Sequence, residues 1–100
     1  MARKVVWAQE SVKDLESIAE YIARDSHYYA ASFVQDIVNA ANSLGQLSER
    51  GRVVPEFDTS KIRELFVSDY RLIYLLEDSR IVILGIIHGK RDLTRLWKKL

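Results

Sequence analysis

The stretch from residue 62 to residue 92 constrains the fold of this chain most. It contains three runs rich in branched and aromatic residues, which read IRELFV, YRLIYLL and RIVILGIIH. Only the short polar breaks Ser68-Asp69 and Glu77-Asp78-Ser79 separate these runs. Branched and aromatic residues favour strands, and short polar breaks favour tight turns, so the stretch predicts a meander of adjacent antiparallel strands.

The residue pattern inside the runs predicts how the sheet is used. The last run is apolar from residue 81 to residue 87 apart from one glycine. This indicates a central strand covered on both sides, although a buried helix of the same length would have the same composition. Three charged residues, Arg63, Glu64 and Arg71, interrupt the other two runs. Charges in a half-buried sheet need a partner or water, so these three form either an ion-pair set or part of a working surface.

Length and composition narrow the class of protein. One hundred residues predict a single domain over residues 1–100. The absence of cysteine excludes disulfides and thiolate metal sites, and it fits a reducing cytoplasm. His27 and His88 have no ligand pattern around them, so we expect neither a metal nor a cofactor. No run has the apolar core of a signal peptide or of a membrane span, so we expect a soluble, cytoplasmic protein without a membrane partner.

Charge is distributed unevenly along the chain. Residues 1–49 carry four basic and seven acidic side chains, whereas residues 50–100 carry eleven basic and seven acidic ones. The basic excess gathers at the end of the chain, at Lys90, Arg91, Arg95, Lys98 and Lys99. A positive field of this size can steer an acidic protein or a polyphosphate, but it is weaker than that of a dedicated nucleic-acid binder. A solvated charged tail is the alternative.

The rest of the chain predicts the elements that pack on the meander. Residues 4–7 form a short apolar run suited to an edge strand. Residues 8–24, and then the segment up to Gly45, carry apolar stripes at helical spacing. The turn and capping residues Asp25-Ser26-His27 separate the two stripes, so we expect an antiparallel helical hairpin. Residues 48–60 predict an ordered surface loop, and residues 89–100 predict a short amphipathic helix.

The order of strand, two helices, loop and three strands indicates an α+β fold. We expect the N-terminal strand and the antiparallel helical hairpin to pack on a mostly antiparallel sheet that ends in the three-strand meander. The hairpin covers one face of this sheet. The other face should be partly open, with the basic end of the chain at its rim, and it is the predicted functional surface.

Familiar catalytic motifs are missing from the sequence. It has no phosphate loop, no nucleophile elbow and no zinc-protease motif. The remaining cluster is Arg71, His88, Lys90 and Arg91. Fixed cations beside an imidazole can hold a phosphodiester, stabilise its transition state and protonate a leaving oxygen. The same set can form an anion-binding patch for a partner, which is favoured because no pair of side chains is an evident acid and base.

Two sequence segments follow the predicted strand and helical hairpin, GRVVPEF and then IRELFVSDYRLIYLLEDSRIVILGIIHGKRDL. In this order, the chain resembles the RelE/ParE superfamily of bacterial type II toxins. The similarity covers about residues 5–95. It implies a toxin that a cognate antitoxin neutralises by burying apolar side chains in a groove on the toxin. It also implies that promoter DNA is reached only through the antitoxin.

The superfamily has two main activities. ParE-like members inhibit DNA gyrase, and they are more similar to this chain in the long hairpin, the GRVVPE loop and the IREL strand. RelE-like members cleave messenger RNA in the ribosome with dispersed lysines, arginines and a C-terminal aromatic residue. The resemblance places their arginines on Arg71 and Arg91 and their C-terminal tyrosine on Trp97. Their two lysines fall on Ile62 and Glu64, which cannot supply the same chemistry.

We therefore predict a ParE-like, non-catalytic inhibitor of gyrase. Target contact is expected from the basic end, at Lys90, Arg91, Arg95, Trp97 and Lys98. Antitoxin contact is expected at Arg63 and, on the hairpin, at Val12, Leu15 and Phe33. The alternative is a ribosome-dependent endoribonuclease that uses Arg71, His88 and Arg91. A second alternative is an inactive toxin that only binds its antitoxin as a co-repressor.

Overall fold

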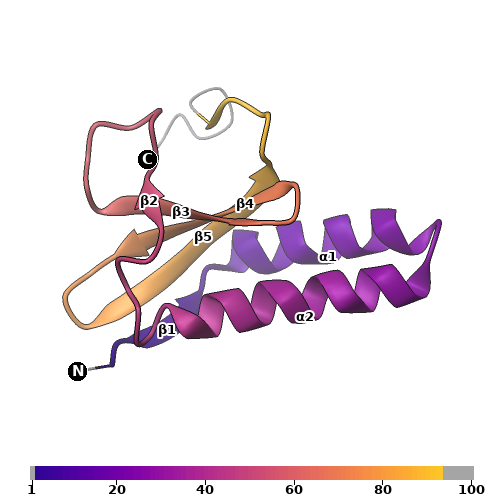
Figure 1. Cartoon of the computed structure of the whole chain (residues 1–100), viewed down its shortest axis with the longest axis horizontal. Helices are drawn as coiled ribbons and strands as arrows, with labels where there is room; N and C mark the ends of the chain where they lie inside the picture. The colour runs from indigo at the N-terminus through magenta and orange to yellow at the C-terminus, as the bar shows by residue number, and fades with distance from the viewer. Residues whose placement is uncertain (1, 94–100) are drawn as a thin grey trace.

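The computed structural model describes residues 2–93 as two helices and five strands. In chain order these are β1 (Lys4–Trp7), α1 (Gln9–Ala23), α2 (His27–Ser43), β2 (Arg52–Val53), β3 (Ile62–Val67), β4 (Tyr70–Leu76) and β5 (Arg80–His88). The two helices lie side by side across one face of the sheet, which confirms the predicted α+β architecture (Figure 1). Neither described helix has the length and apolar character needed to cross a membrane. The helix predicted over residues 89–100 falls mainly on residues 94–100, which lie outside the described range.

The helical hairpin forms as the two apolar stripes predict. Its second helix begins at a serine cap, because the Ser26 hydroxyl accepts a hydrogen bond from the Tyr29 N–H at 3.1 Å. At the start of α1, the buried Ser11 hydroxyl donates to the Ala8 carbonyl at 2.6 Å. The connection between the two helices has three residues, and a connection this short makes them antiparallel neighbours.

The strand order in the sheet is β1-β5-β4-β3-β2. Strands β3, β4 and β5 are antiparallel neighbours, as the meander predicts. Strand β1 lies at the edge and pairs in parallel with β5, but only along Arg80 to Ile83. Strand β5 thus lies between β1 and β4, which confirms the predicted central strand and leaves its second half without a strand neighbour on the β1 side.

A β-bulge explains why the last apolar run does not alternate. On β4, Ile73 pairs with Gly85 and the next residue, Tyr74, pairs with Ile83, so Leu84 is the extra residue of the bulge. A bulge of one residue reverses which side chains point to each face. Both Ile83 and Ile86 consequently reach the core beneath the hairpin, although their numbers differ by three.

Each face of the sheet carries its own apolar core. The core under the hairpin contains the buried residues Phe33, Ile37, Ala41, Leu44, Leu72, Tyr74, Ile81, Ile83 and Ile86. The core on the far face contains Val54, Ile62, Ile73, Ile87 and Leu93. The loop after β2 and the segment after β5 therefore cover the middle of the face that we expected to be partly open. Phe66 remains half exposed on that face.

The predicted surface loop of residues 48–60 includes a strand that the sequence did not reveal. Strand β2 has only two residues and pairs with Arg63 and Glu64 of β3. The buried Tyr74 hydroxyl anchors the loop, since it donates to the Ser48 carbonyl at 2.8 Å and accepts from the Gly51 N–H at 3.0 Å. A Cβ atom at Gly51 would lie 2.5 Å from the Glu64 carbonyl oxygen, so this close approach requires glycine.

Candidate functional site

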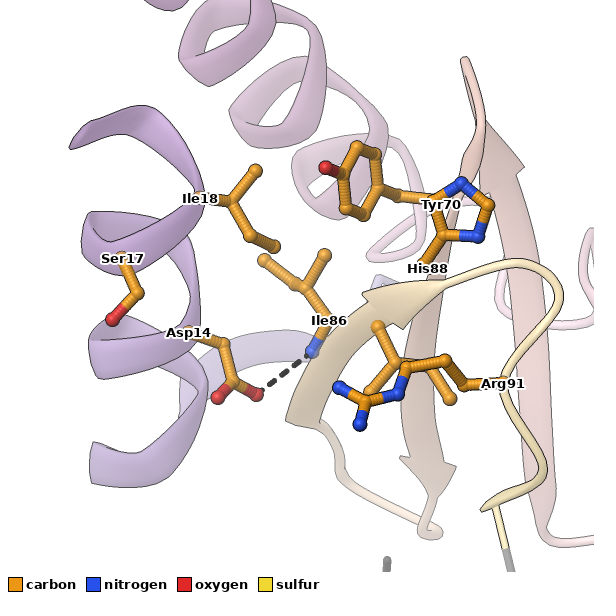
Figure 2. Close-up of a pocket in the computed structure, with 8 residues that line it drawn as sticks. Asp14, Ser17, Ile18, Tyr70, Ile86, His88 and Arg91 are labelled. Carbon is orange, nitrogen blue, oxygen red and sulfur yellow. Dashed lines mark hydrogen bonds between the residues drawn. The ribbon is translucent and has the colours of Figure 1, made fainter. Parts of the chain in front are cut away.

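A pocket of about 450 Å³ lies between α1 and the end of β5 (Figure 2). It opens where β1 no longer pairs with β5. Polar and charged side chains line it together with three isoleucines: Asp14, Ser17, Ile18, Tyr70, Ile86, Ile87, His88 and Arg91. These residues come from both helix and sheet and from the segment after β5, so only the folded chain brings them together.

Asp14 covers the edge of β5 that has no strand neighbour. Its Oδ2 accepts a hydrogen bond from the Ile86 N–H at 3.0 Å, the contact that a carbonyl of an adjacent strand would otherwise make. Burial raises the pKa of the Asp14 carboxyl; the bond from Ile86 opposes this change and the nearby Glu10 charge adds to it. Asp14 therefore places a desolvated carboxyl group at one wall of the pocket.

Tyr70 and His88 form another wall. They pair directly across β4 and β5, and their rings meet edge to face with centroids 5.5 Å apart. The Lys90 N–H donates to Nδ1 of His88 at 3.3 Å, so Nδ1 acts as an acceptor. A neutral His88 in this arrangement carries its proton on Nε2.

Arg91 adds a cation to the pocket from the segment after β5. Its N–H donates to the His88 carbonyl at 3.0 Å, which makes a tight turn. Arg91 is exposed, and Figure 2 shows its side chain extending from this segment towards the side of the pocket where Asp14 lies. The pocket thus combines a carboxyl group, an imidazole, a phenol and a guanidinium, a set able to bind a polar or anionic group and to exchange protons.

Arg71 is not part of this pocket. Its side chain is 4% exposed and lies in an ion-pair network on the far face of the sheet. Two of its nitrogens bind the two carboxylate oxygens of Glu56 at 2.7 and 2.8 Å, and Nε binds Glu64. Glu64 in turn pairs with Arg52. Of the two roles expected for the charges in the sheet, Glu64 and Arg71 therefore have the first, that of an ion-pair set. His88 and Arg91 form a separate group in the pocket.

The same network controls the charge of Glu56. Hydrogen bonding from Arg71 is the main cause that lowers the pKa of Glu56 to about 2, with a further bond from the Leu93 N–H. The partners likewise raise the pKa of Arg71, led by its bond to Glu56. Both groups are ionised at neutral pH, and the buried charges compensate each other.

The residues predicted for target contact occupy the end of the described chain. Lys90 and Arg91 are exposed. The other three predicted residues, Arg95, Trp97 and Lys98, lie outside the described residues.

The residues predicted for antitoxin contact differ in accessibility. Val12 is 41% exposed on α1, whereas Leu15 is partly buried against the core under the hairpin. Phe33 is buried in that core and offers little surface. Arg63 donates to the Ser60 and Gly51 carbonyls at 3.0 and 3.1 Å, so it ties the chain before and after β2 to the sheet.

Two important residues escaped the sequence analysis. Asp14 comes four residues before Ile18, so it lies on the same helical face as the apolar stripe. A carboxylate on an apolar face was the sequence signal that could have identified it. Glu56 lies in a loop and finds Arg71 only through the tertiary fold, so the sequence carried no local signal for it. Within residues 2–93 no cluster of side chains is suited to holding a metal ion.

Comparisons with known proteins give consistent matches. Residues 5–93 match the family model of the ParE toxin of the type II toxin-antitoxin system parDE. Toxin RelE2 of Caulobacter vibrioides is 34% identical over 89 residues, which cover 88% of this chain and 97% of that toxin.

Two solved structures share the fold. One is the chromosomal ParDE toxin-antitoxin system from P. aeruginosa, with a TM-score of 0.73 and 23% identity over 89% of this chain and 98% of that one. The other is the toxin-antitoxin complex RelBE2 from Mycobacterium tuberculosis, with a TM-score of 0.65 and 20% identity over 88% of this chain and 99% of that one.

Proposed function

Because the chain belongs to the ParE toxin family of type II toxin-antitoxin systems, we propose that it inhibits DNA gyrase without catalysing a reaction and that a cognate antitoxin neutralises it. The surface assigned to the target is the basic end, with Lys90 and Arg91 followed by Arg95, Trp97 and Lys98. The antitoxin surface is assigned to the hairpin around Val12 and Leu15, with Phe33 contributing from the core. The fourth assigned residue, Arg63, lies on β3, two strands from the β5 strand on which α1 packs.

One observation carries the preference for binding over cleavage. The strand arginine that a ribonuclease would need at the phosphodiester, Arg71, has its side chain almost fully buried and uses Nε, Nη1 and Nη2 on protein partners. An RNA phosphate would have to replace Glu56, and the displaced carboxylate would repel it. This arrangement supports a structural role for Arg71 and a non-catalytic toxin.

A gyrase supercoiling assay tests the proposal. Purified toxin should abolish the supercoiling of a relaxed plasmid, and purified antitoxin should restore it. The charge reversal Arg91→Glu should weaken inhibition, because it changes an exposed cation of the assigned surface and leaves the cores untouched. Full gyrase activity at saturating toxin would refute the proposal.

A second candidate function rests on the pocket. Asp14, Tyr70, His88 and Arg91 line one cavity, so a proton-transferring pair and a cation are available without Arg71. This supports an endoribonuclease reading, in which His88→Ala abolishes growth arrest and leaves antitoxin binding intact. Messenger RNA that stays whole during arrest would exclude it.

A further inference from the structure

Residues 89–93 follow β5 and are held by hydrogen bonds from distant parts of the chain. The Gly89 N–H donates to the Asp69 carbonyl at 2.8 Å, which ties the segment to the turn between β3 and β4. The Arg91 carbonyl accepts from Nη1 of Arg71 at 3.0 Å, and the Leu93 N–H donates to Glu56 at 3.1 Å. Leu93 itself is fully buried in the far-side core.

Glu56 and Arg71 act as a unit in these contacts. Their two parallel hydrogen bonds match the planar guanidinium to the carboxylate, which fixes the orientation of both groups. The same Oε2 and Nη1 atoms that form one of these bonds also hold Leu93 and Arg91. We call this pair with its two backbone contacts the Glu56–Arg71 clasp.

Stability alone does not explain the clasp. Removing two charges from water is expensive, and apolar side chains of the same volume would often stabilise a fold as well. An ion pair does supply directional bonds, which apolar contacts lack. Here those bonds end on the backbone of residues 91 and 93, so their effect is to fix the path of the chain after β5.

We propose that Glu56 and Arg71 are positioning residues for the described part of the basic end that is assigned to the target, and above all for Arg91. The clasp anchors the main chain of Arg91, and the Arg91 side chain lines the pocket beside His88. Without the clasp, the Arg91 carbonyl and the Leu93 N–H would lose these two side-chain partners, which fix the path of the main chain that carries this guanidinium. This inference rests on the proposed function, because the surface that the clasp positions is the one assigned to the target.

The chain offers a matched control in Arg52. This residue pairs with Glu64, the same carboxylate that binds Nε of Arg71. Unlike Arg71, it has no hydrogen bond to residues 89–93 among the described contacts. Arg52→Gln therefore removes an ion pair from the network and leaves the clasp in place, whereas Glu56→Gln and Arg71→Lys change the clasp itself.

Amide hydrogen exchange on the full chain tests the anchoring. In Glu56→Gln, the protection of the Leu93 amide should fall by about tenfold more than that of the Leu72 amide in β4, since the acceptor of Leu93 loses its charge while Leu72 changes only with the stability of the whole fold. Arg52→Gln should leave both amides as in the wild type. Unchanged protection of Leu93 in both Glu56→Gln and Arg71→Lys would overturn the proposal.

Growth arrest after induced expression tests the positioning without assuming a target. Glu56→Gln should raise the toxin level needed for arrest by about tenfold, the scale of one lost charge-assisted contact. In an Arg91→Ala background it should add nothing, because the residue being positioned is gone. Two results would overturn the inference. One is full arrest by a variant whose Leu93 amide has lost its exchange protection, and the other is an additive effect of Glu56→Gln in the Arg91→Ala background.

The two proposals fail in different ways. If wild-type toxin causes arrest while gyrase stays fully active, gyrase inhibition is refuted and the clasp is still judged by its variants. If wild-type toxin causes no arrest, the proposed function fails and the exchange experiment alone decides whether the clasp exists.

Discussion

Replacing Arg71 by alanine separates a structural arginine from a catalytic one. The substitution removes two nearly buried ion pairs and leaves Glu64, whose side chain is fully buried, with Arg52 as its remaining cation. Breaking a buried pair by removing one partner costs about 3–5 kcal/mol, because the other charge stays buried. For a domain of this length, each kcal/mol lowers the Tm by about 4–8 °C, so we expect a fall of at least about 12 °C.

Calorimetry or urea unfolding provides the assay, and another ion pair provides the control. Arg80 pairs with Glu77 on the surface, where both side chains are well exposed. Arg80→Ala should cost less than about 1 kcal/mol, as for most surface pairs. If Arg71→Ala lowered the Tm by no more than Arg80→Ala does, the buried ion pairs would not stabilise the fold and the structural assignment would be wrong.

Further predictions concern single groups. Because the pKa of Glu56 is about 2 in the folded chain and 4.5 otherwise, its contribution to stability is complete above pH 4.5 and is lost as the pH falls toward 2; the Tm difference between wild type and Glu56→Gln should shrink over this range. The pKa of Asp14 is raised, so folding favours its protonated form; Asp14→Asn should stabilise the protein at pH 7 and have less effect at pH 3, as measured by urea unfolding. Gly51→Ala should destabilise by about 1–3 kcal/mol, since the new methyl group would lie 2.5 Å from the Glu64 carbonyl oxygen and 2.7 Å from the Tyr74 hydroxyl; an unchanged Tm would contradict this.

Elements with a strong local pattern were predictable from the sequence. The hairpin follows from two apolar stripes and a serine cap, and the meander follows from three strand-like runs with short breaks. These signals are contained within about ten to twenty neighbouring residues, where the helix and strand periods act directly.

Features that depend on distant contacts were not predictable in the same way. Strand β2 is too short for a period, and it forms only because β3 offers it a partner. The bulge at Leu84 breaks the alternation that would have assigned the faces of β5. The bond from Ile86 to Asp14 joins residues 72 positions apart, and the pocket beside it therefore has no sequence motif.

The function of Arg71 shows the limit most clearly. Sequence reasoning left its role open between an ion pair and a working surface. The structure identifies an ion pair, because the carboxylate of Glu56, fifteen residues away in a loop, accepts two hydrogen bonds from the Arg71 guanidinium. Burial and partner identity, rather than residue type, decide what a charged residue in a sheet does.

Plasmid topology and messenger RNA integrity, measured in the same culture after induced expression, test the account most directly. We expect the plasmid to lose negative supercoiling while messenger RNA stays whole, because the proposed function is inhibition of gyrase and because Glu56 and Glu64 hold the buried Arg71. Cleaved messages on plasmid of unchanged topology would contradict the account.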